Sequence, residues 1–193
     1  MQRLVVGISG ASGAIYGLRL LEELRRHPSV ETHLVISRPA ERTIAAETDY
    51  PLDAVRSLAS CCHAVDDIGA PIASGSFATM GMVVMPCSIR SASAIACCLG
   101  DNLLLRAADV TLKEARKLLL VVRESPLHAG HLENLLSLAR MGVIILPPVP
   151  AFYSRPKSIE DIVDQTVGRV LDHFGLPHRL YREWGSPPAG LPR

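Results

Sequence analysis

The sequence predicts an α/β fold in which helices cover both faces of a parallel sheet. Short apolar runs alternate along the chain with longer segments of helical period, and five such strand–helix units follow one another. This alternation is typical of a doubly wound sheet, because parallel strands need crossover connections. The apolar runs are nearly continuous, which indicates strands that are buried on both faces.

The first unit starts with the apolar run 4–8 and continues through Gly7, Gly10 and Gly13 into a helix from Ala14. A strand, a glycine turn and a helix start form a phosphate-binding layout, since the helix N-terminus offers free N–H groups. The spacing G-x-x-G-x-x-G is not the dinucleotide fingerprint, and no acidic residue follows the next strand. The turn therefore favours a mononucleotide phosphate over NAD. Close packing of helix on strand is the alternative interpretation.

The later units are assigned from the same two periodicities. The other predicted strands are 32–36, 82–85, 118–122 and 143–146, and the other predicted helices are 39–48, 91–99, 103–114, 131–141 and a last one from Ser158 to Gly175. Ser158 and Asp161 form a capping-box-like pair. Because no repeat or linker divides the chain, we expect one domain over residues 1–185, followed by a mobile tail at 186–193.

Composition limits the classes of function. With 48% hydrophobic residues in 193, the chain can bury a substantial core, and a net charge of +1 argues against nucleic-acid or membrane-surface partners. No apolar run approaches the ~18 residues of a membrane span, and Met1 leads directly into the first strand, which leaves no room for a signal peptide. The odd number of cysteines predicts reduced thiols and a cytoplasmic protein.

Two short motifs resemble fragments of a metal site. These are Cys61-Cys62-His63 and His128-x-x-His131. Neither has a partner motif at structural-zinc spacing, so the sequence predicts no metal.

Polar side chains follow four of the predicted strands at the point where each strand ends. They are Ser9 and Ser12, Ser37 and Arg38, Ser88 and Arg90, and Arg123 and Glu124. In a parallel sheet these ends meet at one edge, where open α/β folds bind their ligands. Cations and serine hydroxyls gathered there predict a pocket for one or more phosphate groups.

The chain also resembles the flavin prenyltransferases of the UbiX type, which are described too as the small subunit of aromatic acid decarboxylases. The resemblance covers nearly the whole chain to about Gly185. The matching motifs are Gly-Ile-Ser-Gly-Ala-Ser-Gly-Ala at 7–14, Ala-Glu-Thr-Asp at 46–49, Ala-Ser-Gly-Ser at 73–76, Pro-Cys-Ser at 86–88, Arg-Ala-Ala-Asp-Val-x-Leu-Lys-Glu at 106–114, Arg-Glu-x-Pro-Leu at 123–127, His-Leu-Glu-Asn at 131–134, Pro-x-Pro-Ala-Phe-Tyr at 148–153 and Arg-x-Trp-Gly at 182–185.

This resemblance implies a three-layer, flavodoxin-like Rossmann fold assembled as a homo-oligomer, a dodecamer. It implies FMN as the cofactor. The residues that it assigns to FMN are Gly10, Ala11, Ser12, Ser37, Ser88, Ile89, Arg90, Ser91, Arg106 and Arg123. Arg106 would belong to the same site, from this subunit or a neighbouring one.

The resemblance further implies a reaction in which a dimethylallyl group passes from dimethylallyl monophosphate to N5 and C6 of reduced FMN. The product, prenylated FMN, would serve a UbiD-type decarboxylase. The residues assigned to the prenyl substrate are Ser74, Lys113, Glu124, Tyr153, Arg169 and Trp184. Those assigned to catalysis are Ser12, Glu47, Lys113 and Glu124.

These residue types suit the chemistry. Lys113, Arg169 and Tyr153 would stabilise the charge that develops on the leaving phosphate. Ser12 and Glu47 would relay the N5 proton as a general acid/base pair. Glu47 is singled out by the resemblance alone, because an isolated Glu at a helix end is usually solvated. Where many members carry a tryptophan before Ala-Ser-Gly-Ser, this chain has Ile68, which implies a less aromatic prenyl pocket.

Two other functions compete with prenyl transfer. One is a flavin-binding accessory subunit that stores or delivers cofactor without catalysis. The other is a flavin-dependent cysteine decarboxylase of related fold, which relies on a His soon after the glycine turn. Here the early histidines, His27 and His33, lie at a helix end and inside a strand.

Overall fold

The computed structural model describes residues 1–185, and the tail predicted at 186–193 lies outside the described residues. The chain divides into two compact units, Met1–Pro148 and the part from Val149 onward. The single domain expected over 1–185 stays a prediction. Within the described residues, no helix combines the length and the apolar character that crossing a bilayer requires.

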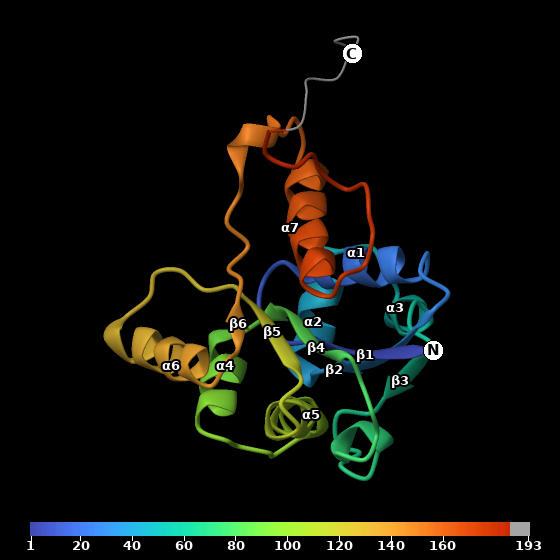
Figure 1. The fold of residues 1–193 in the computed structure, drawn as a ribbon, viewed down its shortest axis with the longest axis vertical. Coiled ribbons are helices and arrows are strands. Elements are labelled where there is room, and N and C mark those ends of the chain that lie inside the picture. Colours follow the sequence, from blue (N-terminus) through green and yellow to red (C-terminus); the bar gives the residue numbers. More distant parts are fainter. Residues whose placement is uncertain (186–193) are drawn as a thin grey trace. The chain divides into compact units, whose positions relative to one another are not determined.

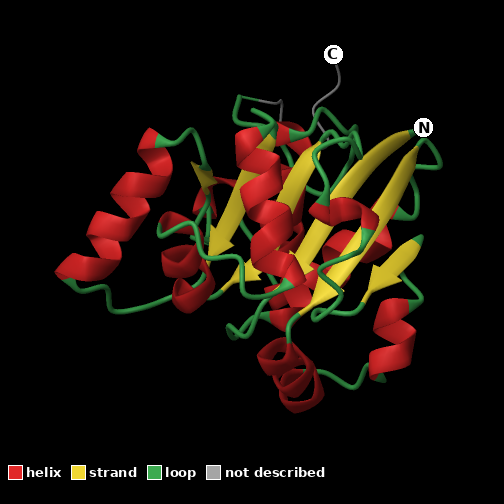
Figure 2. Cartoon of the chain, turned by 90° about the horizontal axis from the view of Figure 1, so that it is seen from below, coloured by secondary structure: helices red, strands yellow, loops and turns green. Residues whose placement is uncertain are grey.

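The first unit is built on a six-stranded parallel sheet (Figures 1 and 2). Its strands are β1 (Gln2–Ile8), β2 (Val30–Ile36), β3 (Cys61–His63), β4 (Gly81–Cys87), β5 (Lys117–Val122) and β6 (Ile144–Ile145). Their order is β3-β2-β1-β4-β5-β6. This is the Rossmann order, and without the short edge strand β3 it becomes the flavodoxin order. The α/β fold class is therefore confirmed.

Helices lie on both faces of the sheet, as Figure 2 shows. They are α1 (Ala14–Leu24), α2 (Arg38–Glu47), α3 (Leu52–Arg56), α4 (Ile89–Ala96), α5 (Leu103–Lys113) and α6 (Ala129–Arg140), with a 3₁₀ turn η1 (Pro71–Ala73). Helix α1 packs on β1 and β4, and α5 packs on β4 and β5. The core between α4, α5 and the sheet is formed by aliphatic side chains of alternate strand positions.

Two elements of this unit differ from the sequence-based expectation. The five predicted strands are present, but β3 and the short helix α3 fall in the region 49–67, for which no period was predicted. Strand β3 has only three residues, none of them fully buried. It therefore lacks the continuous apolar run by which the other strands were predicted.

Gly17 brings α1 directly onto the sheet. A Cβ at Gly17 would lie 2.3 Å from the carbonyl oxygen of Met85 in β4. The absence of a side chain lets the helix backbone approach the strand backbone. The start of α1 is thereby fixed beside the carboxyl ends of β1 and β4.

The second unit contains a 3₁₀ turn η2 (Phe152–Ser154) and the helix α7 (Ile159–His173). The predicted capping box is confirmed. Ser158 Oγ accepts from the backbone N–H of Asp161 at 3.2 Å, and Asp161 Oδ2 accepts from the backbone N–H of Ser158 at 3.2 Å. Both contacts satisfy donors that an α-helix leaves open at its start.

Candidate functional site

A pocket of about 640 Å³ lies at the carboxyl edge of the sheet in the first unit. Its volume suits a small-molecule ligand. The predicted site residues that line it are Gly10, Ser37, Ser88, Ile89, Arg90, Ser91 and Glu124. They come from the turns after β1, β2, β4 and β5, so the structure brings those turns together as the strand pattern predicts.

Two serines of the pocket cap helices that begin there. Ser37 Oγ accepts from the N–H of Ala40 at 3.3 Å at the start of α2. Ser88 Oγ accepts from the N–H of Ser91 at 3.2 Å at the start of α4, and it donates to Ser91 Oγ at 3.0 Å. Both helix N-termini therefore border the pocket, and each contributes a partial positive charge that favours an anion.

Ser9 joins the first turn to the turn after β4. Its side chain is buried, donates to the carbonyl of Pro86 at 3.1 Å and accepts from the N–H of Ser88 at 2.7 Å. Ser9 was predicted only as a polar residue at a strand end, and its partners lie 77 and 79 positions away. It acts as a positioning residue for Ser88. The thiol of Cys87, the residue before Ser88, is not a reactive nucleophile, because burial raises its pKa to about 12.

Gly10 allows the first turn to contact α2. A Cβ at this position would lie 2.4 Å from Cβ of Pro39. Two carbon atoms cannot lie this close, so the backbone of the first turn or that of α2 would have to move. The glycine is required here by close approach, and both residues line the pocket.

Glu47 and Ser12, predicted to act together, are in hydrogen-bond contact. The carboxylate of Glu47 also accepts from the backbone N–H groups of Gly13 at 2.8 Å and Ala14 at 3.0 Å. Burial raises the pKa of this carboxyl. The three hydrogen bonds and the charge of Arg123 lower it by more, so the net pKa lies below its ordinary value. Glu47 is therefore ionised at neutral pH.

These contacts correct one expectation about the first turn. The sequence predicts free N–H groups at the start of α1 for a phosphate, but the carboxylate of Glu47 occupies those of Gly13 and Ala14. A phosphate placed there would meet a negative charge. The helix starts that border the pocket are those of α2, α4 and α5.

Three further predicted residues lie around this edge. Arg123 follows β5, where its backbone N–H donates to the carbonyl of Cys87 at 3.0 Å. Arg106, in the first turn of α5, forms an ion pair with Asp109 at 2.7 Å and does not line the pocket. Ile68 is 64% exposed and also does not line the pocket.

Ser74 and Lys113 form a second polar group at the opposite edge of the sheet. Lys113, at the end of α5, pairs with Glu114 at 2.7 Å. A Cβ at Gly75 would lie 2.9 Å from Lys113 Nζ, so the Ser74 loop is beside that amine. Both segments precede the amino ends of β4 and β5. A seven-residue strand spans about 20 Å, so a single first unit does not bring this group to the pocket.

The second unit holds the remaining predicted residues. The rings of Tyr153 and Trp184 meet edge to face with centroids 5.3 Å apart, beside a hollow of about 350 Å³. Arg169, on α7, contacts Asp172 at 3.1 Å and Tyr181 Oη at 3.4 Å. The hydrogen bond that Arg169 donates to Tyr181 is the main cause of its raised pKa.

Comparison with known proteins decides the family. The Flavoprotein family model matches residues 1–171. Flavin prenyltransferase UbiX of Escherichia coli strain K12 is 55% identical over 186 residues, which cover 95% of this chain and 98% of the relative. The chain belongs to the UbiX family of flavin prenyltransferases.

Two solved UbiX-type structures have the same fold. One, described as a dodecameric FMN-dependent UbiX-like decarboxylase from Escherichia coli O157:H7, has a TM-score of 0.94 and 51% identity, with 96% of this chain and 100% of that chain covered. The other, AnUbiX (PadA1) in complex with FMN and dimethylallyl pyrophosphate, has a TM-score of 0.92 and 50% identity, with 96% and 98% covered. The resemblance to the UbiX family is thus confirmed.

Proposed function

We propose that this UbiX-family protein is a flavin prenyltransferase. It transfers the dimethylallyl group of dimethylallyl monophosphate to N5 and C6 of reduced FMN, and the prenylated FMN serves a UbiD-type decarboxylase. The observation that carries the proposal is the pocket bordered by the starts of α2, α4 and α5, with an ionised Glu47 held on the first turn at the same edge of the sheet. The UbiX relative with FMN and dimethylallyl pyrophosphate supports it.

The pocket suits a flavin mononucleotide. Hydroxyls of Ser37, Ser88 and Ser91, with the guanidinium of Arg90, offer donors to a phosphate. The apolar part of the lining, including Leu104, suits a flat ring system. The residues that would hold FMN are Gly10, Ala11, Ser12, Ser37, Ser88, Ile89, Arg90, Ser91, Arg106 and Arg123. When bound and reduced, the flavin supplies the nucleophilic ring atoms.

Ser12 and Glu47 would move the proton of the reaction. The lowered pKa keeps Glu47 ionised at neutral pH, so its carboxylate is available to accept a proton through the hydroxyl of Ser12. The hydrogen bonds from Gly13 and Ala14 fix the carboxylate in place. In this arrangement Glu47 would act first as a general base, and it would return the proton later in the reaction.

The leaving phosphate would be held by Lys113, Arg169 and Tyr153, with Ser74 and Glu124 beside it. Cationic and hydroxyl donors stabilise the charge that builds on the departing oxygen. The indole of Trp184 lies against Tyr153 and would cover the prenyl chain. Arg169 and Lys113 pair with Asp172 and Glu114, which compete with the phosphate for them.

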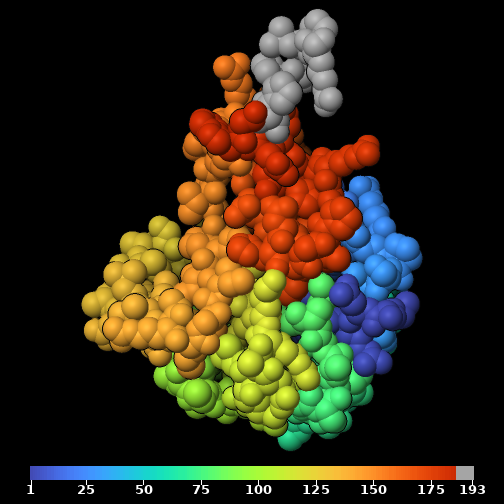
Figure 3. Space-filling model, viewed as in Figure 1, coloured from blue at the N-terminus to red at the C-terminus, as the bar shows by residue number. Residues whose placement is uncertain are grey.

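We propose that the site is completed between copies in a homo-oligomer, as a dodecamer. Lys113 and Ser74 lie at the sheet edge opposite the pocket, so another copy must bring them to the flavin. The relative from Escherichia coli O157:H7 is described as dodecameric. Helix α6 projects at one side of the first unit (Figures 1 and 3), and exposes Leu132 and Leu136 by more than half. An exposed apolar face of this kind suits a contact between subunits.

We further propose that the protein works in the cytoplasm. All five cysteines of the chain are free, which fits a reducing compartment.

An anaerobic assay tests the proposed function. The protein is incubated with reduced FMN and dimethylallyl monophosphate. The flavin is then extracted, and its mass is measured by mass spectrometry. We expect a mass gain of one prenyl unit. Flavin that binds but gains no such mass under these conditions would overturn the proposal and leave the accessory-subunit alternative.

The variant Glu47→Gln separates the enzyme from an accessory subunit. Glutamine keeps an oxygen that can accept from Gly13 and Ala14, so FMN binding should persist. Loss of the proton acceptor should reduce product formation by about a hundredfold or more. Equal rates for the native protein and the variant would contradict the assignment of Glu47 as the base.

A further inference from the structure

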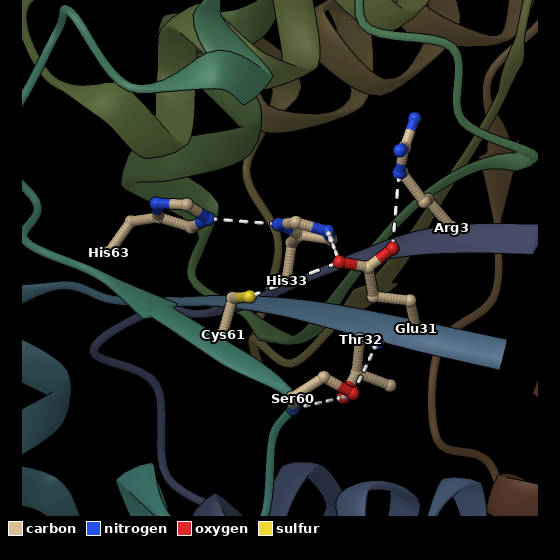
Figure 4. A network of polar contacts seen from close by, with 7 residues as sticks. All are labelled: Arg3, Glu31, Thr32, His33, Ser60, Cys61 and His63. Carbon is tan, nitrogen blue, oxygen red and sulfur yellow. Dashed lines mark hydrogen bonds and ion pairs between the residues drawn. The ribbon is translucent and has the colours of Figure 1, made fainter. Parts of the chain in front are cut away.

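Four side chains of metal-binding type meet on one face of the edge strand β3 and its neighbour β2 (Figure 4). Glu31 and His33 are two positions apart on β2, and Cys61 and His63 are two positions apart on β3. The members of each pair therefore point to the same side of the sheet. The strands are in register with His33 opposite Cys61. None of the four lines the carboxyl-edge pocket.

His33 carries an unsatisfied nitrogen that faces this cluster. The residue is only 3% exposed, and its Nδ1 lies 3.0 Å from His63 Nε2. Its Nε2 makes no hydrogen bond of good geometry among the described residues, and its nearest polar neighbour is the carboxylate oxygen Glu31 Oε1 at 3.4 Å, whose charge acts on the ring. Buried polar atoms are rarely left without a partner, so this nitrogen requires an explanation.

The neighbours of His33 prepare that nitrogen to act as a ligand. Either ring can carry the proton between His33 Nδ1 and His63 Nε2. With that proton on His33 Nδ1, His33 Nε2 keeps a lone pair on the side of Glu31 and Cys61. The ring lies side by side with the ring of His63, with 11° between their planes, and Phe77 contacts it edge-on at 5.0 Å. Histidine ligands of metal ions commonly donate their other ring N–H in this way.

We propose that Glu31 Oε1, His33 Nε2 and Cys61 Sγ bind one divalent cation of the zinc class, with His63 as the residue that orients His33. The three ligand atoms lie within 4.8 Å of one another. Normal zinc bond lengths in a tetrahedron place nitrogen and oxygen about 3.4 Å apart and sulfur and oxygen about 3.6 Å apart. The observed separations are 3.4 Å for His33–Glu31 and 4.0 Å for Cys61–Glu31.

The charges around the cluster fit a divalent ion. The thiolate of Cys61 and the carboxylate of Glu31 together neutralise two positive charges, and the thiol proton is released to water on binding. Arg3 Nε holds the other oxygen of Glu31 at 3.1 Å, which turns Oε1 toward His33. A set with one imidazole, one thiolate and one carboxylate favours zinc over magnesium or calcium.

The site would fasten β3 to the sheet. Strand β3 is short and lies at the sheet edge, and Glu31 and Cys61 are partly exposed, so an ion and a fourth, water ligand have access from solvent. No metal was predicted from Cys61-Cys62-His63 because the partner motif lies about thirty residues away, on β2. The proposed role is structural and does not depend on the proposed prenyl transfer.

Titration of the metal-free full-length protein with Co²⁺, followed by Zn²⁺, tests the site. We expect one Co²⁺ per chain with a thiolate-to-metal absorption band, displaced by Zn²⁺, and a higher thermal midpoint in the loaded protein. Cys61→Ser should abolish the band and weaken Zn²⁺ binding at least tenfold. Cys62→Ser is the matched control, since Cys62 is exposed and alternates to the other face, and it should change neither.

Several outcomes would overturn the site. They are the absence of a thiolate band, a band that persists in Cys61→Ser, and a band lost equally in Cys62→Ser. If Cys61→Ser does not fold, Glu31→Gln, at a partly exposed position, must weaken Zn²⁺ binding while the thiolate band of bound Co²⁺ is kept. Prenyl transfer is measured in parallel with metal-free protein and should be unchanged, which separates failure of this proposal from failure of the proposed function.

Discussion

The carboxylate of Glu47 has both a structural role and a proposed catalytic role. It caps α1 by accepting from the backbone of Gly13 and Ala14, and it contacts Ser12, which the proposed reaction needs. The same hydrogen bonds that stabilise the helix start also keep the carboxylate ionised. Its position is thus set by the fold before any ligand binds.

The capping role predicts a pH-dependent stability difference between the native protein and Glu47→Gln. The folded pKa of Glu47 is below its ordinary value of 4.5, so its ionised form stabilises the fold above that value. We expect the native protein to be more stable at pH 7 by on the order of 0.3–1 kcal/mol, at the low end because the carboxylate is exposed. Going down in pH from 4.5, the difference should fade. Urea unfolding at several pH values measures it, and a difference that grows with acid would contradict the sign.

A second prediction concerns Gly10. In Gly10→Ala the new Cβ would lie 2.4 Å from Pro39, so the first turn or α2 must move. We expect a loss of about 1–3 kcal/mol of unfolding free energy and weaker FMN binding, because both residues line the pocket. The control is Gly100→Ala, where no atom lies within 4 Å of the added Cβ. If the two substitutions cost the same, the packing explanation is wrong.

At the scale of single residues, the sequence predicted many site residues but not their hydrogen-bond partners. The strand ends predicted Ser37, Ser88 and Glu124 as neighbours, and the structure places all three around one pocket. The sequence pattern did not indicate that Glu47 would occupy the start of α1, because the two segments are 33 residues apart. Hydrogen bonds across such a separation depend on how helices pack, which periodicity does not encode.

Among the elements, α7 is the one whose start is best defined by its sequence. Ser158→Ala removes the acceptor for the N–H of Asp161 and should cost about 1 kcal/mol. Ser158→Thr keeps a hydroxyl and should lose much less. Both are measured by denaturant unfolding of the full chain. Equal losses for alanine and threonine would show that the capping box contributes little.

The elements differ in how well a sequence predicts them. The central strands β1, β4 and β5 are continuous apolar runs and were predicted within two residues. Strand β3 gave no signal, because pairing with β2 rather than burial defines it. An edge strand with one polar face is recognised only when its neighbour is known, and the same holds for the ligand cluster that it shares with β2.

For the whole molecule, the sheet itself separates the predicted catalytic and substrate-binding residues of the first unit into two groups. Glu47 and Ser12 lie at the carboxyl edge, and Lys113 and Ser74 lie at the amino edge. Motifs identified the residues but did not say which copy of the chain supplies each one. Strand length favours the proposed arrangement in which another copy supplies Lys113, since about 20 Å of sheet lies between the edges of one chain.

Mixed oligomers test this division. Glu47→Gln and Lys113→Ala chains, each inactive alone, are co-expressed with different tags and purified together. If one copy supplies Glu47 and another supplies Lys113, random assembly leaves about a quarter of the sites with both native residues, and that fraction of activity should return. The control pairs Glu47→Gln with Ser12→Ala, whose residues share one turn of one chain, so no site is complete and no activity returns. Recovery in both mixtures, or in neither, would mean that the two edges do not meet between subunits.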